Sequence, residues 1–526
     1  MQADTLPPSA GAGTGAHSKL EGLFTAACIL FVGALALLTY DIRSDYRLAV
    51  LVGFLSLCVF AIVPNRRLLL VLAWLFVHPL SIETTFVVAP PMHKEFLPRL
   101  ITLSGSDLVL FMLLIVLACE ASVTKQRVWR WPPVVTPLLC LFAWAILGLL
   151  AGSAGPTPEG WLFVIQQAKL VLYIVAVSSS IRTRDEFLLV LGCLASVIAL
   201  QELFVVASLA RGKPIQITSP LQGSLMTFAG TETRATGTLG HPNTQAAFHT
   251  FLTLPLLGLL GCRNPRWRWF GAAVIGGSVV CIVMTSSRSA WIALAAGLFG
   301  LLLAALAHNV VRRLIWRYVT WTLPVGAVIL GLFWSRIATR IIRGDEGATD
   351  SRLRAMATAM DIAGAHPLAG AGPGNFIAGS IQLHPLRQMH NEWNKPSTKP
   401  RPVRFEAFEY VEKQIHEKFY VLPLQVHNLF LLVLSELGAI GIVLFLWLQW
   451  RFFSLVRRCL RAESVVLALI AVGLYGTFWA MQFYMTLDLF SVDKPLQILY
   501  LPVILAAALD RVLDEPPADA ALRTVS

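Results

Sequence analysis

The 526-residue chain is 56% hydrophobic and only 14% charged, with a mean hydropathy of +0.68. About a quarter of the residues in a soluble domain are charged, so this chain has too little polar surface for a water-soluble globule. Its net charge of +12 does not indicate nucleic-acid binding. The basic residues lie in short clusters between apolar runs, where they fix membrane topology.

Apolar runs of about 17–25 residues, the length that spans a bilayer core, recur along the chain. They predict an all-α polytopic membrane protein with about 12–14 transmembrane helices and one large, partly helical outer loop. Residues 1–19 predict a disordered tail rather than a signal peptide, because no basic start or cleavage site is present. The candidate spans lie near residues 20–40, 48–63, 68–82, 105–121, 133–151, 162–180, 187–209, 242–261, 269–285, 289–307, 316–334, 426–450, 464–483 and 495–510.

Basic residues cluster on alternate short loops, which gives the orientation. By the positive-inside bias these loops are cytoplasmic, and both termini lie on the same side. The predicted division is a cytoplasmic tail at 1–19, N-terminal transmembrane helices at 20–334, a large outer loop at 335–425, C-terminal transmembrane helices at 426–510 and a cytoplasmic tail at 511–526.

The large outer loop has predicted structure of its own. Thr349 or Asp350 can cap a helix that stops at His366 and Pro367. The following GAGPGN stretch predicts turns in which Gly370, Gly372 and Gly374 adopt positive φ. An apolar stripe over residues 405–419 predicts an amphipathic helix that packs on the helix ends or lies among lipid headgroups.

Two arginines stand at the predicted outer edge of the membrane. Arg288 lies in MTSSRSAW, between two apolar runs with almost no connecting loop. Its planar guanidinium can donate two hydrogen bonds to phosphate oxygens, which predicts a substrate-binding residue. The alternative is an arginine whose side chain extends to the lipid headgroups. Arg234 precedes GTLGHPN, where Asn243 or Thr244 can cap a helix. An arginine beside helix-terminal amides predicts an anion site, and a simple turn with a cap is the alternative.

Three further ionisable residues lie at or inside predicted spans. His427 begins a span directly after the large loop, where a neutral imidazole can take a proton from a hydroxyl. An interface histidine or a helix cap is the alternative for this residue alone. Glu436 lies deeper in the same span and Lys169 in another. Glu436 is expected either to orient one of the arginines or to pair with Lys169.

No metal or cofactor site is predicted. The eight cysteines lie in or beside apolar runs, which favours packing over a disulfide framework or a metal site. The histidines of the outer loop match no metal-binding spacing, and the chain has no Walker motif, no GxSxG and no dinucleotide fingerprint.

Three stretches, taken in order, carry a resemblance to a known family. They are GTLGHPNTQAAF, TSSRSAWIALAAGLFG, and AHPLAGAGPGNF followed by VHNLFLLVLSELGAIGIVLF. The ordered set resembles the O-antigen ligase and polymerase superfamily over roughly residues 230–450. The expected number of spans and the basic insertion NKPSTKPRPVR favour a polymerase over a ligase.

The resemblance implies metal-independent, inverting glycan transfer at the periplasmic face of the bacterial inner membrane. The donor would be an undecaprenyl-pyrophosphate-linked glycan, and the acceptor a glycan or the lipid A core, with membrane lipids around them. A transporter or flippase of lipid-linked sugars is the alternative. The expected catalytic residues are His427 and Arg288, and the expected substrate-binding residues are Arg234, Arg288, Lys169, His241, Asn243 and Glu436.

Overall fold

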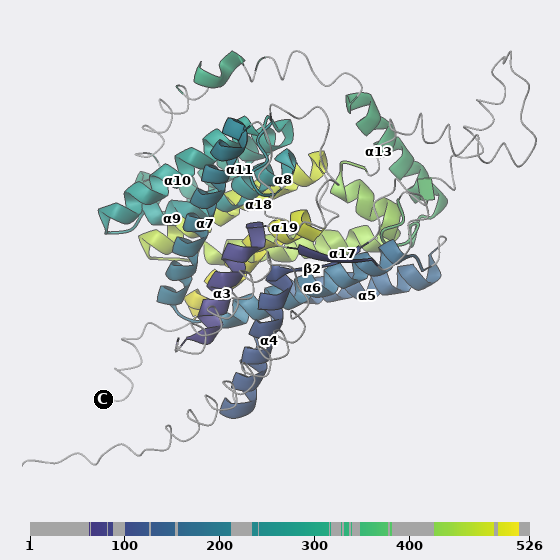
Figure 1. The fold of residues 1–526 in the computed structure, drawn as a ribbon, viewed down its shortest axis with the longest axis horizontal. Coiled ribbons are helices and arrows are strands. Elements are labelled where there is room, and N and C mark those ends of the chain that lie inside the picture. Colours follow the sequence, from purple (N-terminus) through teal and green to yellow (C-terminus); the bar gives the residue numbers. More distant parts are fainter. Residues whose placement is uncertain are drawn as a thin grey trace, which may run out of the picture.

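The computed structural model describes residues 63, 65–80, 83–87, 100–125, 128–152, 156–211, 234–239, 241–314, 316, 328, 331–335, 338, 348–376, 379–380, 426–488 and 493–514. The N-terminal helices and those of the middle of the chain lie to one side of the ribbon, and α5, α6, α13 and α17 extend to the other (Figure 1).

The described chain is helical apart from one small hairpin. Strands β1 (Glu83–Val87) and β2 (Leu100–Ser104) pair antiparallel, with Glu83 opposite Ser104. The helices are α3 (Arg66–Val77), η1 (His78–Leu80), α4 (Gly105–Thr124), α5 (Val135–Ala151), α6 (Pro158–Ser180), α7 (Arg184–Arg211), α8 (Pro242–Thr253), η3 (Leu254–Leu256), α9 (Leu257–Leu260), α10 (Pro265–Met284), α11 (Arg288–Ala307), α13 (Ala348–Ala365), α17 (Leu429–Cys459), α18 (Val465–Leu487) and α19 (Asp493–Asp514).

Within the described ranges, eight helices are long and apolar enough to cross a membrane: α4, α6, α7, α10, α11, α17, α18 and α19. They confirm the prediction of a helical multi-pass membrane protein. The β1–β2 hairpin was not predicted, because residues 83–104 were expected to form only a loop between two spans. The predicted spans at 20–40, 48–63 and 316–334 lie wholly or largely outside the described residues, and so does the amphipathic helix at 405–419.

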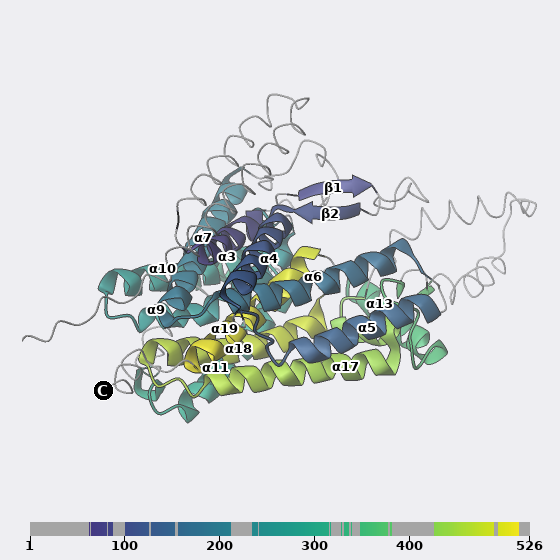
Figure 2. The ribbon, with the colours of Figure 1, turned by 90° about the horizontal axis from the view of Figure 1, so that it is seen from below.

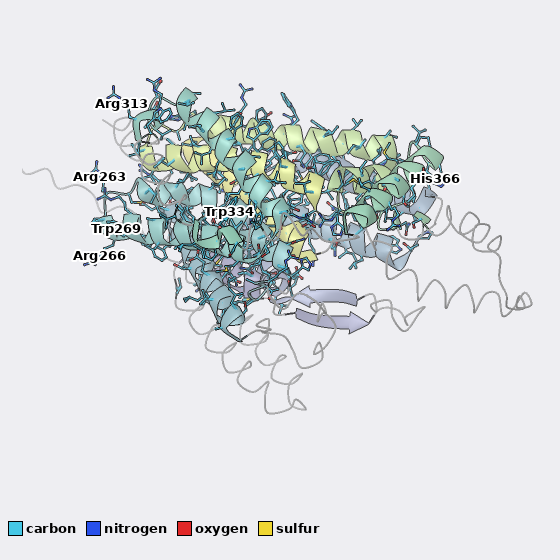
Figure 3. The ribbon with its side chains drawn as sticks, turned by 90° about the horizontal axis from the view of Figure 1, so that it is seen from above. Arg263, Arg266, Trp269, Arg313, Trp334 and His366 are labelled. Atoms are coloured by element: carbon cyan, nitrogen blue, oxygen red, sulfur yellow. The ribbon has the colours of Figure 1, made fainter. Side chains whose placement is uncertain are left out.

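The two ends of the molecule differ in composition. Arg263, Arg266 and Arg313 lie together at one end, and His366 lies at the opposite end (Figure 3).

Small residues let α11 and α18 pack closely. Gly297 and Gly476 face each other so tightly that a Cβ on Gly476 would meet the Gly297 carbonyl oxygen at 2.7 Å. At the end of this contact the Ser289 hydroxyl donates to the Leu487 carbonyl, at 3.4 Å. The start of α11 therefore lies beside the end of α18.

Helix α17 is broken at Gly438, whose φ of 66° and ψ of −166° are not helical. The sequence predicted one uninterrupted span here, so this is a correction. In an intact helix the N–H groups of residues 439–441 would donate to the carbonyls of residues 435–437. The break removes those partners within a span, where the surroundings hold no water to replace them.

The GAGPGN turn supplies the missing partners. Ala371 and Gly372 donate their N–H groups to the carbonyls of Ser435 and Glu436, both at 2.9 Å. In return, the N–H groups of Ala439 and Ile440 donate to the carbonyls of residues 367 and 368, at 2.8 and 3.4 Å. We call this exchange of backbone hydrogen bonds the clasp.

The indole N–H of Trp144 on α5 donates to the Leu437 carbonyl at 2.9 Å, which satisfies the third carbonyl at the break. Helices α5, α6 and α17 lie side by side along this part of the molecule, with the β1–β2 hairpin outside them (Figure 2). Ala371 and Gly372 of the clasp are buried, whereas residues 367 and 368 are exposed.

The structure confirms the glycine prediction for the turn. Gly370, Gly372 and Gly374 have φ values of 69°, 100° and 70°. A Cβ on Gly370 would meet the Glu436 carbonyl carbon at 2.4 Å, and one on Gly438 would meet the Leu368 carbonyl carbon at 2.3 Å. The two backbones approach so closely that neither position has room for a side chain. The predicted stop of α13 before His366 and Pro367 is also confirmed.

Gly438→Ala should lower the stability of the protein. The strained backbone costs about 1–3 kcal/mol for a residue with a side chain, and the clash with Leu368 adds to that. The control is Gly364→Ala in α13, where a Cβ would meet nothing within 4 Å. The control should be neutral or stabilising by about 0.5–1 kcal/mol. Thermal unfolding in detergent measures both, and equal midpoints for Gly438→Ala and wild type would contradict the role of the break.

Candidate active site

Helix α8 begins at a group of polar residues that hold one another in place. His241 is its N-cap, and the imidazole Nδ1 accepts from the Asn243 N–H at 3.1 Å. The Asn243 side-chain oxygen accepts from Arg234 Nη2 at 2.8 Å, and Arg234 Nε donates to the Thr285 carbonyl at 2.8 Å. Arg234 is thereby fixed between the start of α8 and the junction of α10 with α11.

That junction is three residues long, Thr285 to Ser287, and Arg288 is the first residue of α11. Ser286 adopts a positive φ of 53°, which makes the turn tight. Ser287 gives α11 no side-chain cap, so the first N–H groups of the helix are not covered from that position. An uncapped helix start next to an arginine is a typical setting for an anion.

The end of α18 joins the same group. The Tyr484 hydroxyl donates to the Asn243 carbonyl at 2.7 Å. Asp488, the C-cap of α18, lies 3.2 Å from His427, measured between Oδ1 and Nδ1. The Asp488 side chain is 7% exposed and that of His427 is 35% exposed. This contact between a buried carboxylate and a half-exposed imidazole joins the start of α17 to the end of α18.

Longer-range electrostatic interactions link this group to further charged residues. His241 lies within range of the charges on Asp488, Arg234 and His427. Arg234 and Asp488 also act on Tyr484, together with Arg352 of α13. Residues from α8, α13, the start of α17 and the end of α18 thus form one polar cluster at the helix ends.

His241 is neutral at physiological pH. Burial lowers the pKa of its imidazole to about 4, and the nearby Arg234 and His427 act in the same direction against the opposing effect of Asp488. Because Nδ1 accepts a hydrogen bond from the Asn243 N–H, the single ring proton is on Nε2. His241 is therefore a neutral residue of the cluster with its proton on Nε2.

The structure brings together Arg234, His241, Asn243 and His427 from the expected set, and places Arg288 at the adjoining helix start. It places Lys169 elsewhere. The Lys169 ammonium lies 3.1 Å from Asp107 Oδ2 on α4, and Tyr173 donates to Oδ1 of the same carboxylate at 2.8 Å. Lys169 thus takes part in an ion pair between α4 and α6.

The expected partners of Glu436 were wrong. Among the residues that the structure describes, its carboxylate contacts neither Lys169 nor an arginine, and instead accepts from the backbone N–H groups of Gly374 and Phe376, at 3.0 and 3.1 Å. A buried carboxylate needs charge-compensating or hydrogen-bonding partners, and here the glycine-rich turn provides them. Glu436 belongs to the clasp.

Three residues of the cluster were not singled out for a role from the sequence. They are Asp488, Tyr484 and Arg352. Asp488 directly follows an apolar run at its outer end, just as His427 directly precedes one, and this symmetry was the available signal. The sequence around Arg352 did not indicate a role in the site, because the pattern SRLR is typical of one turn of an amphipathic helix.

The fold and the cluster define a multi-pass membrane protein with a polar site at its helix ends. Residues 272–446 match the family model described as O-antigen ligase, so this part of the chain is similar to an O-antigen ligase domain. The match includes Arg288, Arg352 and His427, while Arg234 and Asp488 lie on either side of it. A search of curated proteins finds no match.

His241→Asn should flatten the dependence of stability on pH. The imidazole titrates near pH 4 in the folded protein and near 6.5 when unfolded. Between these values the unfolded chain binds more protons, so stability falls as pH is lowered through this range. A shift of this size corresponds to about 3 kcal/mol at complete titration.

Asparagine caps helices well, so the variant keeps α8 intact while it removes the titrating group. Thermal unfolding in detergent from pH 4 to 7 measures the effect. His308→Asn, at the far end of α11, is the control and should keep the wild-type slope. An unchanged slope in His241→Asn would show that another group causes the loss at low pH.

Proposed function

We propose that the protein transfers a glycan from an undecaprenyl-pyrophosphate-linked donor to a hydroxyl acceptor at the periplasmic face of the inner membrane. The acceptor is another glycan or the lipid A core, so the protein acts as an O-antigen or exopolysaccharide polymerase or as a ligase. The observation that carries the proposal is the contact of His427 with Asp488 beside the arginine-bearing helix starts.

The donor pyrophosphate binds at the starts of α8 and α11. Arg234, held by Asn243 and Thr285, presents its guanidinium in a fixed orientation. Arg288 and the uncapped N–H groups of α11 add positive charge and donors at the neighbouring helix start. His241 contributes its neutral Nε2–H to a phosphate or sugar oxygen.

His427 is the general base. Its Nδ1–H donates to the Asp488 carboxylate, which leaves the Nε2 lone pair for the acceptor hydroxyl. As Nε2 takes the proton, the acceptor oxygen forms a bond to the anomeric carbon. The bond from that carbon to the phosphate oxygen breaks, and undecaprenyl pyrophosphate leaves with the electron pair. Attack opposite the leaving group inverts the anomeric centre.

Two charges develop in this step, a negative charge on the pyrophosphate and a positive charge on the His427 imidazole. Each is stabilised by side chains that are already positioned before the reaction. The arginines stabilise the negative charge on the departing pyrophosphate, so the proposed transfer is metal-independent. Asp488 stabilises the imidazolium that forms at His427. Such preorganised groups are each worth roughly 2.7–4 kcal/mol of the barrier.

Transport of lipid-linked sugars is the alternative, and the placement of the charges favours transfer. Arg234, His427 and Asp488 gather at helix ends, where α8 and α17 begin and α18 ends. The deeper Lys169 is engaged with Asp107. A passage for a charged pyrophosphate would need such groups along its whole depth.

His427→Ala should reduce glycan transfer about 10²–10⁴-fold, because it removes the base. Arg288→Ala should reduce it about 10²–10³-fold, because it removes charge stabilisation of the leaving group. The measurement is product formation by purified protein with a lipid-pyrophosphate-linked glycan in detergent. His366→Ala, directly after the end of α13, is the control.

Wild-type transfer by His427→Ala would overturn the mechanism. Movement of the lipid-linked glycan across liposomes by the wild-type protein, with no product from glycan or lipid A core acceptors, would favour the transport function instead.

A further inference from the structure

Glu436 has a placement that the proposed chemistry does not explain. It lies within α17, nine residues after His427, and is 5% exposed. Both of its carboxylate oxygens are used: Oε2 accepts from Gly374 and Oε1 from Phe376. The side chain therefore fastens the GAGPGN turn at two points.

The same turn is anchored on its other side. The Thr157 hydroxyl, at the start of α6, donates to the Asn375 side-chain oxygen at 2.6 Å. Pro373 lies against α5, where a Cβ on Gly148 would meet its ring at 3.6 Å. The turn thus connects the break in α17 to the α5–α6 pair, and Glu436 is the side chain of α17 that holds it.

The part of α17 before the break carries His427. Asn428 caps this part, with its side chain accepting from the Leu431 N–H at 3.0 Å. Nine residues of helix span about 13 Å, so a tilt of about 5° at the clasp moves the His427 end by about 1 Å. A displacement of that size can cost about 10²-fold in rate.

We propose that Glu436 is a positioning residue for the base. By holding the GAGPGN turn on the break in α17, it sets the angle of the helical part that presents His427 to Asp488. It does not touch the substrate. The inference rests on the proposed function for its catalytic consequence, but the mechanical link from Glu436 to His427 can be measured without activity.

Glu436→Gln is the first test. The amide oxygen can accept a hydrogen bond from one of the two backbone N–H groups. The amide NH2 group is itself a donor, so it cannot accept from the other N–H group. We expect kcat for glycan transfer to fall at least about tenfold, with KM for the lipid-linked donor within about twofold of wild type. The control is Glu120→Gln, which makes the same substitution in a glutamate paired with Arg182 at the other end of the bundle. It should leave both constants unchanged.

A double variant tests whether the effect passes through His427. If Glu436 acts by placing the base, Glu436→Gln should slow the wild-type protein and leave His427→Ala no slower than before. Equal fractional losses in both backgrounds would show a general structural effect and overturn the inference.

A labelling experiment measures the mechanical link from Glu436 to His427 without an assay of glycan transfer. The His427→Cys protein and the His427→Cys/Glu436→Gln protein are each treated with a membrane-impermeant maleimide. The labelling of the native cysteines, measured in the wild-type protein, is subtracted from both. A loosened helical part should raise the labelling rate of Cys at position 427 several-fold. Equal rates would overturn the inference, whereas a wild-type protein that transfers no glycan would overturn the proposed function alone.

Trp144→Phe is a second variant, for the case in which Glu436→Gln does not accumulate in the membrane. It removes the donor to the Leu437 carbonyl and leaves the Glu436 carboxylate intact. The same lowered kcat with unchanged KM is expected, and wild-type kinetics would count against the clasp.

Discussion

The break in α17 at Gly438 is the constraint on which the proposed site depends. A helix inside a membrane can be interrupted only where protein groups replace the lost backbone hydrogen bonds. Here Ala371, Gly372 and the Trp144 indole serve the three exposed carbonyls. The interruption is thus a joint between two helical parts, and the part that begins after His427 takes its direction from the partners at the joint.

The convergence of helix ends explains how residues far apart in the sequence act together. The close contact of α11 with α18 places Arg288 near Asp488, and the Tyr484–Asn243 hydrogen bond ties the end of α18 to the start of α8. Helix starts offer N–H groups to an anion, and the end of α18 offers a carboxylate to a histidine. The proposed reaction needs a cationic side for the leaving group and a basic side for the acceptor.

Local features could be predicted from the sequence, and long-range pairings could not. The positive φ of Gly370, Gly372 and Gly374 follows from a turn that only glycine accommodates readily. Gly438 gave no such signal, because glycine also occurs within membrane helices and the run around it is evenly apolar. Glu436 was expected to need a charged partner. The structure satisfies it with backbone N–H groups, which no sequence pattern reveals.

Two of the described pairs of oppositely chargeable side chains differ in their relation to the proposed reaction. The contact of Lys169 with Asp107 joins α4 to α6 and takes no part in the proposed reaction. His427 beside Asp488 becomes an ion pair only when the imidazole takes a proton. An interaction that strengthens as the transition state forms lowers the barrier, whereas one of constant strength contributes only to the fold. The Asp488 carboxylate is therefore of most use to the proposed reaction when it is fixed in place beforehand, which its position as the buried C-cap of α18 achieves.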